Sequence, residues 1–335
     1  MRRFLFILLF ASIVMVNVTA QRSISNEIQI ESESAVAIDE FYMGMLYHRD
    51  CDYSKAMDWF QKGAAKGQSD AMCQIGYYYL NGLGVSKDYD QAMVWYMKAA
   101  DRESPEAMNA LGYLYRHGYG CQQDYTKSME WFLKAAERGV DNSMLNIGYF
   151  YSMGLGVKQD YTTAMEWFNK AADNGNDIAM TNIGYFYEHG YGVLQDYTKA
   201  MEWYLKASEK GELNAMYYIG CLHYNGEGVT QNYGQAMEWY QKAADRHNNP
   251  SINKMGEMYY HGKGVPQDYG KAFDLFKQAA EASENPSADA MNMLSTCYRF
   301  GYGTTKDLEK ADYWLKMAQE TGSDEANLIK LIMGM

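Results

Sequence analysis

The sequence predicts an all-α fold: a solenoid of about eight helix-turn-helix repeats of 36 residues with a C-terminal capping helix. The first sign is a glycine that follows an aliphatic residue or Met and recurs, mostly 36 residues apart, at Gly44, Gly76, Gly112, Gly148, Gly184, Gly220 and Gly256. The second sign is the tryptophans, which keep the same period at Trp59, Trp95, Trp131, Trp167, Trp203, Trp239 and, after a longer step, Trp314. Because both signals run through most of the chain, we expect one repeated unit and not a set of different domains.

Each unit contains two predicted helices joined by a tight turn. In residues 70–100, apolar residues three and four positions apart form one helical face before Gly82 and another after Asp88. The turn holds two glycines separated by one residue, and glycine accepts backbone angles that other residues avoid. The glycine pairs are Gly82/Gly84, Gly118/Gly120, Gly154/Gly156, Gly190/Gly192, Gly226/Gly228, Gly262/Gly264 and Gly301/Gly303.

Residues at the helix ends mark where the helices start and stop. Side chains that can accept a hydrogen bond from a helix N-terminus precede the second helices at Asp88, Asp124, Asp160, Asp196, Asn232 and Asp268. Glycines suited to end a helix follow them at Gly67, Gly139, Gly175 and Gly211. Within a unit, the glycine of the first helix lets the partner helix approach closely. Each tryptophan and the aromatic residue next to it are predicted to fill the space between units, so that Trp167→Ala lowers the melting temperature.

The period also sets the domain boundaries. The repeats occupy residues 36–322, in units of about 36–67, 68–103, 104–139, 140–175, 176–211, 212–247, 248–286 and 287–322. The first unit has His48 to Cys51 in place of the glycine turn. Asp324 to Leu331 aligns with the start of a ninth first helix, so residues 323–335 are predicted to form a capping helix. Residues 21–35 are polar and are predicted to form a flexible leader.

Residues 1–20 have the pattern of a signal peptide. Arg2 and Arg3 precede a short apolar run, and Val18-Thr19-Ala20 offers small residues for cleavage. We therefore expect a secreted or periplasmic protein, cut after Ala20, with no membrane span in the mature chain; an uncleaved membrane anchor is the alternative. The formal net charge of -12 disfavours nucleic acid as a partner, because phosphate backbones are also negative.

The cysteines do not follow the repeat. They are Cys51, Cys73, Cys121, Cys221 and Cys297. In an exported protein they are disulfide candidates, but their number is odd and their positions within the unit differ, so at least one thiol is left over. We expect mostly buried structural thiols, and no particular pair is predicted.

The repeated pattern resembles the Sel-one-like repeat, a relative of the tetratricopeptide repeat. It reads Ala-x-x-x-Ile/Leu-Gly-x-x-Tyr-x-x-Gly-x-Gly-Val-x-x-Asp-Tyr-x-x-Ala-x-x-Trp-Tyr/Phe-x-Lys-Ala-Ala and covers about residues 36–322. The resemblance implies a right-handed superhelix whose first helices line the concave face, and a role in protein-protein interaction. Some secreted bacterial relatives have a disulfide in every repeat. This chain lacks those cysteine pairs, so the cell-wall-like ligands suggested for that subgroup are not carried over.

The sequence contains no motif of an enzyme or of a metal site. Gly-x-Ser-x-Gly, His-Glu-x-x-His and a phosphate-binding loop are absent, so we predict no enzymatic activity, no cofactor and no metal. His117, His189 and His261 share one repeat position in alternate units. At roughly 10 Å per packed unit, they lie too far apart to hold one metal ion. Glu and Lys four residues apart beside the tryptophans, such as Glu166 and Lys170, mark a solvated face.

One stripe of the first helices varies between units while the core positions stay fixed. Relative to the glycine, it contains positions -3, -2, +1 and +4, and its predicted ligand-binding residues are Gln74, Tyr77, Asn109, Tyr113, Asn146, Tyr149, Asn182, Tyr185, Tyr217 and Tyr218. Side-chain amides can bind the backbone of an extended peptide, and tyrosine rings can stack on apolar side chains or sugars. The alternative is that the tyrosines pack between adjacent first helices, and both can hold.

The sequence therefore predicts an extracytoplasmic scaffold or adaptor that binds a protein or peptide on the concave face of its first helices. A protein that binds glycans or cell-wall fragments is the alternative, because of the tyrosines. If the stripe binds the partner, replacing both Tyr149 and Asn182 with alanine is expected to abolish binding and to leave the circular dichroism spectrum intact.

Overall fold

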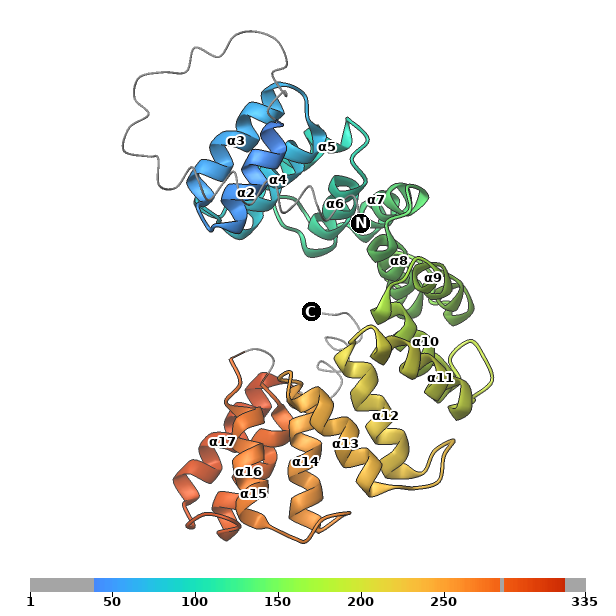
Figure 1. Cartoon of the computed structure of the whole chain (residues 1–335), viewed down its shortest axis with the longest axis vertical. Helices are drawn as coiled ribbons and strands as arrows, with labels where there is room; N and C mark the ends of the chain where they lie inside the picture. The colour runs from blue at the N-terminus through green and yellow to red at the C-terminus, as the bar shows by residue number, and fades with distance from the viewer. Residues whose placement is uncertain (1–38, 284–285, 323–335) are drawn as a thin grey trace, which may run out of the picture. The chain divides into compact units, whose positions relative to one another are not determined.

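The computed structural model describes residues 39–283 and 286–322. The predicted signal peptide (1–20), leader (21–35) and capping helix (323–335) lie outside these residues, as do residues 36–38 of the predicted repeat region. In the described part, the chain forms sixteen helices, arranged as eight pairs in chain order and without strands. Figure 1 shows these pairs following one another from α2 to α17. The predicted all-α solenoid is confirmed.

The two kinds of helix alternate along the chain. The first helices of the units are α2 (Glu40–Arg49), α4 (Ser69–Asn81), α6 (Pro105–His117), α8 (Asp141–Met153), α10 (Asp177–His189), α12 (Leu213–Asn225), α14 (Asn249–His261) and α16 (Ala288–Phe300). The second helices are α3 (Tyr53–Ala65), α5 (Tyr89–Ala100), α7 (Tyr125–Glu137), α9 (Tyr161–Asp173), α11 (Tyr197–Glu209), α13 (Tyr233–Ala244), α15 (Tyr269–Ala280) and α17 (Leu308–Thr321). Each helix packs against the next one in the chain, both within a unit and across the boundary to the following unit.

The helices begin and end where the sequence predicts. The carboxylate of Asp88 accepts a hydrogen bond from the backbone N–H of Gln91 at 2.9 Å, and Asn232 does the same for Gln235 at 3.0 Å. Gly82 ends α4 in the left-handed conformation, with φ of +73°, which a side chain would strain. Helix boundaries in this chain are therefore set by local hydrogen bonds and glycines.

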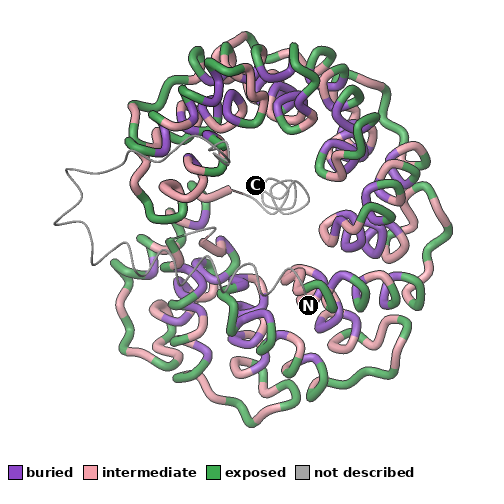
Figure 2. Tube along the Cα trace, turned by 45° about the horizontal axis from the view of Figure 1, so that its top comes forward, coloured by how far each residue is buried: buried purple, intermediate pink, exposed green. Residues whose placement is uncertain are grey.

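An aromatic ring on the second helix forms the centre of each of the first seven units. The ring belongs to the residue after the tryptophan, or after Leu275 in the seventh unit, and is at most 3% exposed in Phe60, Tyr96, Phe132, Phe168, Tyr204, Tyr240 and Phe276. It lies on the glycine of the first helix: a Cβ added to Gly148 would come 2.5 Å from Cε1 of Phe168. Real Cβ atoms do not approach so closely, so the ring requires glycine at this position. Figure 2 shows buried residues recurring in the helix pairs along the chain, with much of the connecting chain exposed.

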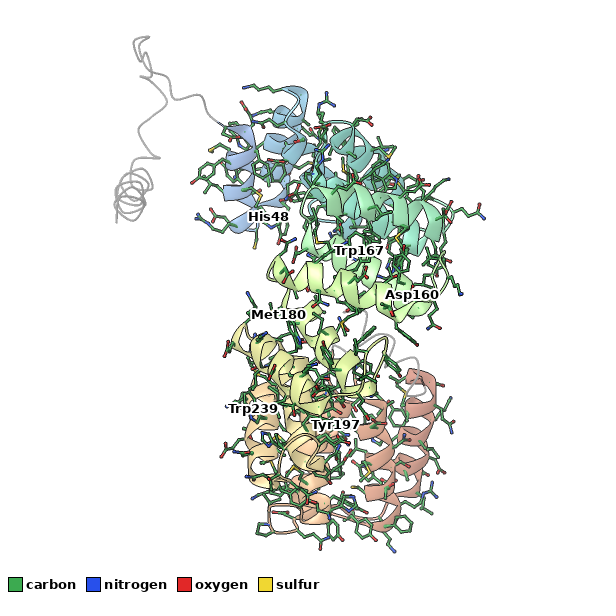
Figure 3. The ribbon with its side chains drawn as sticks, turned by 90° about the vertical axis from the view of Figure 1, so that its right-hand side faces the viewer. His48, Asp160, Trp167, Met180, Tyr197 and Trp239 are labelled. Carbon is green, nitrogen blue, oxygen red and sulfur yellow. The ribbon has the colours of Figure 1, made fainter. Side chains whose placement is uncertain are left out.

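The tryptophans lie at the edge of this core and not at its centre. Of the two adjacent aromatic positions that the sequence assigns to the space between units, only the second is buried. All seven tryptophans are half-buried. Figure 3 labels two of them, Trp167 on α9 and Trp239 on α13. The ammonium group of Lys170 lies over the Trp167 ring, 3.9 Å from its centroid, and is outside ion-pair distance of Glu166. The first six units repeat this cation–π contact at 3.9–4.2 Å, in place of the Glu–Lys pairs that the sequence suggests.

The two aromatic positions should therefore differ in their effect on stability. We expect Phe168→Ala to lower the free energy of unfolding by about 3–5 kcal/mol, because it empties a fully buried site. Trp167→Ala should cost roughly 1–2 kcal/mol, since part of that ring is already in water. Urea denaturation of the two variants measures the difference, and an equal or larger loss for Trp167→Ala would contradict this account of the core.

The glycine beneath the ring gives a second prediction. Gly148→Ala should cost about 1–3 kcal/mol, because its new Cβ overlaps the Phe168 ring. In the Phe168→Ala background most of this cost should disappear, which a double-mutant cycle in urea detects. Gly139→Ala is the matched control: a Cβ there meets no atom within 4 Å, so its cost comes from a φ of +86° and should be independent of Phe168. Additive losses for Gly148 and Phe168 would rule out the proposed contact.

Candidate functional site

The variable stripe of the first helices is the candidate binding site, and its tyrosines do not form a continuous ladder. Tyr77 and Tyr113 are 42% and 39% exposed, whereas Tyr149 and Tyr185 are 1% and 8% exposed. Of the other predicted binding residues, Asn182 is buried, and the half-buried ones are Gln74, Asn109, Asn146, Tyr217 and Tyr218. A ligand that binds along the stripe therefore contacts different side chains in different units.

Tyr149 and Asn182 are a buried structural pair. The amide nitrogen of Asn182 donates hydrogen bonds to the Tyr149 hydroxyl at 2.8 Å and to the carbonyl of Ile178 at 3.0 Å. Burial raises the pKa of Tyr149, so its hydroxyl stays protonated. Replacing both residues with alanine would remove a buried ring and its hydrogen bond. The expectation that this double substitution leaves the fold undisturbed is therefore wrong, and it is not a suitable test of binding.

Several stripe residues connect neighbouring first helices. Arg116 on α6 donates a hydrogen bond to Asn146 on α8 at 2.9 Å. Thr181 on α10 donates to Glu212, at the start of α12, also at 2.9 Å. Similar bonds join Ser143 to Asn109 and Asn248 to Asn214. These hydrogen bonds give part of the stripe a structural role between adjacent units.

A small recess opens on the stripe between α10 and α12. Its volume is about 20 Å³, and it is lined by Ile178, Thr181, Asn182, Tyr185, Glu212, Asn214 and Tyr218. The sequence analysis selected Asn182, Tyr185 and Tyr218 but missed Thr181, Glu212 and Asn214. Glu212 could have been found by comparing the residues that precede the first helices, because most other units have Ser or an amide at this position and this unit has a carboxylate.

Two partly buried carboxylates lie on this part of the chain. Glu212 accepts hydrogen bonds from Thr181 and from the backbone N–H of Ala215, which caps α12. Glu188, at position +4 of the stripe, accepts a hydrogen bond from the Tyr204 hydroxyl at 2.6 Å. Burial raises the pKa of both carboxyl groups, in spite of these hydrogen bonds.

In the part of the chain that the structure describes, the remaining ionisable groups do not gather into a metal site. Within residues 39–283 and 286–322, no three His, Cys, Asp or Glu side chains lie together as a metal site. All five cysteines are free, and they range from the exposed Cys51 to the buried Cys297. Burial raises the pKa of Cys73 to about 12 and that of Cys221 to about 11, so these thiols stay protonated and are poor nucleophiles. His189 stacks on Tyr185, with ring centroids 4.0 Å apart.

The raised pKa of Glu188 predicts a pH-dependent stability. Because the folded chain holds this proton more tightly than the unfolded chain, the contribution of Glu188 to stability falls as pH rises from 4.5 through its folded pKa. Glu188→Gln keeps an acceptor for Tyr204 without the charge. We expect it to raise the melting temperature by about 2 °C at pH 7 and to leave it unchanged at pH 3.5.

Thermal melts at the two pH values test this prediction. The exposed Glu166→Gln is the control, and it should shift the melting temperature little at either pH. A gain of the same size at pH 3.5 and pH 7, or a loss at pH 7, would contradict the assignment of an unfavourable charge to Glu188.

Two solved structures are similar to this chain, and the first of them supports this architecture. A Sel1 repeat protein from Oxalobacter formigenes is 30% identical, and the match covers 84% of this chain and 99% of that one with a TM-score of 0.64. A protective antigen from uropathogenic Escherichia coli strains, described as displaying an SLR fold, is 26% identical over 87% of this chain and 79% of that one, with a TM-score of 0.46. No curated protein matches the sequence.

The family comparison matches every unit of the solenoid. The Sel1 repeat model matches residues 40–68, 69–104, 105–140, 141–176, 177–212, 213–248, 250–284 and 288–320. These segments agree with the helix pairs to within a few residues. Since they cover most of the sequence, the chain belongs to the Sel1 repeat family.

Proposed function

We propose that this protein is an extracytoplasmic scaffold that binds a protein or peptide along its first helices. Sel1 repeat proteins are generally protein-interaction scaffolds and are typically not enzymes. The proposed secreted or periplasmic location rests on the signal-peptide pattern of residues 1–20, with cleavage after Ala20. Among the described helices, none is both long and apolar enough to cross a membrane.

The observation that carries this proposal is the contrast between the two sides of the helix pairs. On the second helices, the Trp–Lys contact repeats with nearly the same geometry in six units. On the first helices, the stripe changes from unit to unit and leaves Tyr77 and Tyr113 open to solvent. A surface that distinguishes one partner from another needs different groups along its length, and the stripe supplies them.

A glycan partner has less support from the arrangement of the tyrosines. A row of sugars stacks on a series of open ring faces, but Tyr149 and Tyr185 are buried. Tyr113 is itself packed beside His117, with ring centroids 4.3 Å apart. Among the predicted binding residues, glycan binding would therefore depend mainly on Tyr77 and Tyr113.

Selection of peptides from a displayed random library on the mature chain tests the proposal. We expect peptides that bind the wild type at least tenfold more tightly than the Tyr77→Ala/Tyr113→Ala variant, because these are the exposed rings among the predicted binding residues. Tyr313→Ala, which removes a 55% exposed tyrosine from the second helix α17, is the matched control and should not change the affinity.

Circular dichroism melts of the same variants separate binding from folding. Peptides that bind all variants equally would place the binding surface elsewhere. Failure to select any peptide, together with binding of soluble oligosaccharides that depends on Tyr77 and Tyr113, would favour the glycan alternative.

A further inference from the structure

We propose that the recess between α10 and α12 is a subsite for the ammonium group of a lysine side chain on the bound protein or peptide. This inference rests on the proposed function and specifies part of the partner's chemistry. It depends on four features of the recess: its carboxylate, its remaining hydrogen-bond acceptor, its aromatic walls and its size.

The carboxylate of Glu212 is the charged group of the recess. Its two hydrogen bonds from Thr181 and Ala215 both end on Oε2, and neither donor carries a charge. Within the described part of the chain, Glu212 forms no ion pair with a Lys, Arg or His side chain, and nearby Asp177 adds further negative potential. By contrast, Glu257 on α14 forms an ion pair with Lys254 at 2.8 Å. Glu212 is thus a partly buried carboxylate whose positive partner is not provided by its neighbours.

Asn182 leaves an acceptor beside this carboxylate. Its amide nitrogen already donates to the Tyr149 hydroxyl and the Ile178 carbonyl, which uses both of its hydrogens. The oxygen Oδ1 is the atom of this side chain that can still bind a ligand. The recess thus offers two acceptors, the Glu212 carboxylate and Oδ1 of Asn182. An ammonium group, which has several N–H donors and no acceptor, suits these acceptors better than a hydroxyl or a carboxylate does.

Two tyrosine rings form the walls of the recess. The centroids of Tyr185 and Tyr218 are 5.9 Å apart, with their planes inclined at 55°. An aromatic ring attracts a cation that lies over its face, within about 6 Å of the centroid. The two rings also offer apolar surface for the methylene chain of a lysine.

The size of the recess favours an ammonium over larger groups. A cavity of about 20 Å³ holds a group of about the size of a water molecule. It is too small for a sugar ring. The net charge of -12 on the whole chain agrees with a basic partner, because it attracts positive segments at long range.

A minimal lysine probe tests the subsite directly. We expect N-acetyl-L-lysine methylamide to shift the side-chain amide signal of Asn182 in a saturable titration followed by NMR, and the norleucine analogue, which lacks the ammonium, not to do so. Glu212→Gln should weaken binding of the lysine probe at least tenfold. This variant keeps an oxygen that can accept from Thr181 and cap α12, so we expect it to fold, which a circular dichroism melt checks.

Two further variants complete the design. Glu166→Gln removes an exposed carboxylate from α9 and should bind the lysine probe as the wild type does. Asn214→Lys places the chain's own ammonium at the edge of the recess, so it should weaken binding of the lysine probe by competition. This variant provides a second test if Glu212→Gln is unstable. Equal shifts with the lysine and norleucine probes, or unchanged affinity in Glu212→Gln or Asn214→Lys, would overturn the proposal.

Peptides selected on the wild type separate this inference from the proposed function. Replacing the key lysine of a selected peptide with norleucine should weaken binding to the wild type at least tenfold and binding to Glu212→Gln much less. Selected peptides that contain no lysine, or tolerate its replacement, would overturn the ammonium subsite and leave the scaffold function standing. Failure to select any peptide would instead count against the scaffold function, while the NMR titration still decides whether the recess binds an ammonium.

Discussion

The contact between an aromatic ring and a glycine holds each of the first seven helix pairs together. The ring of the second helix lies where a side chain of the first helix would otherwise be, so the two backbones approach closely. In the eighth unit, Ser295 and Leu315 occupy these places, and Leu315 is 39% exposed. The core thus weakens where the described array ends. With packing assigned to these two positions, other faces of the first helices are free to vary.

Variation along the first helices serves two purposes in this structure. Residues such as Arg116, Asn146 and Thr181 join neighbouring units by hydrogen bonds, and their identities must suit one another across each boundary. Tyr77 and Tyr113 make the stripe open to solvent in the second and third units. Sequence variation between repeats therefore does not by itself identify a binding surface, since part of it reflects the fit between units.

Glu212 illustrates how a binding group can conflict with stability. A partly buried carboxylate without a cationic partner is costly, and its raised pKa expresses that cost. Ser104 and Asn248 cap the corresponding helices in other units without a charge. A carboxylate at the same position is stabilised most when a cation from a partner enters the recess. This links the destabilising feature to the proposed subsite.

The sequence by itself determined the period, the helix pairs and the helix ends, because these depend on local rules: apolar spacing, capping by residues such as Asp88, and glycines with positive φ. It also identified the stripe and three of the residues that line the recess. Only the tertiary structure decided that Phe168 is the buried ring and Trp167 is half-buried, and that Tyr149 is enclosed while Tyr113 is open. Neighbouring positions on a helix differ by about 100° in direction, so which one is buried depends on how the next helix packs. The exposure of a stripe residue depends on side chains about one repeat away, which local sequence patterns do not specify.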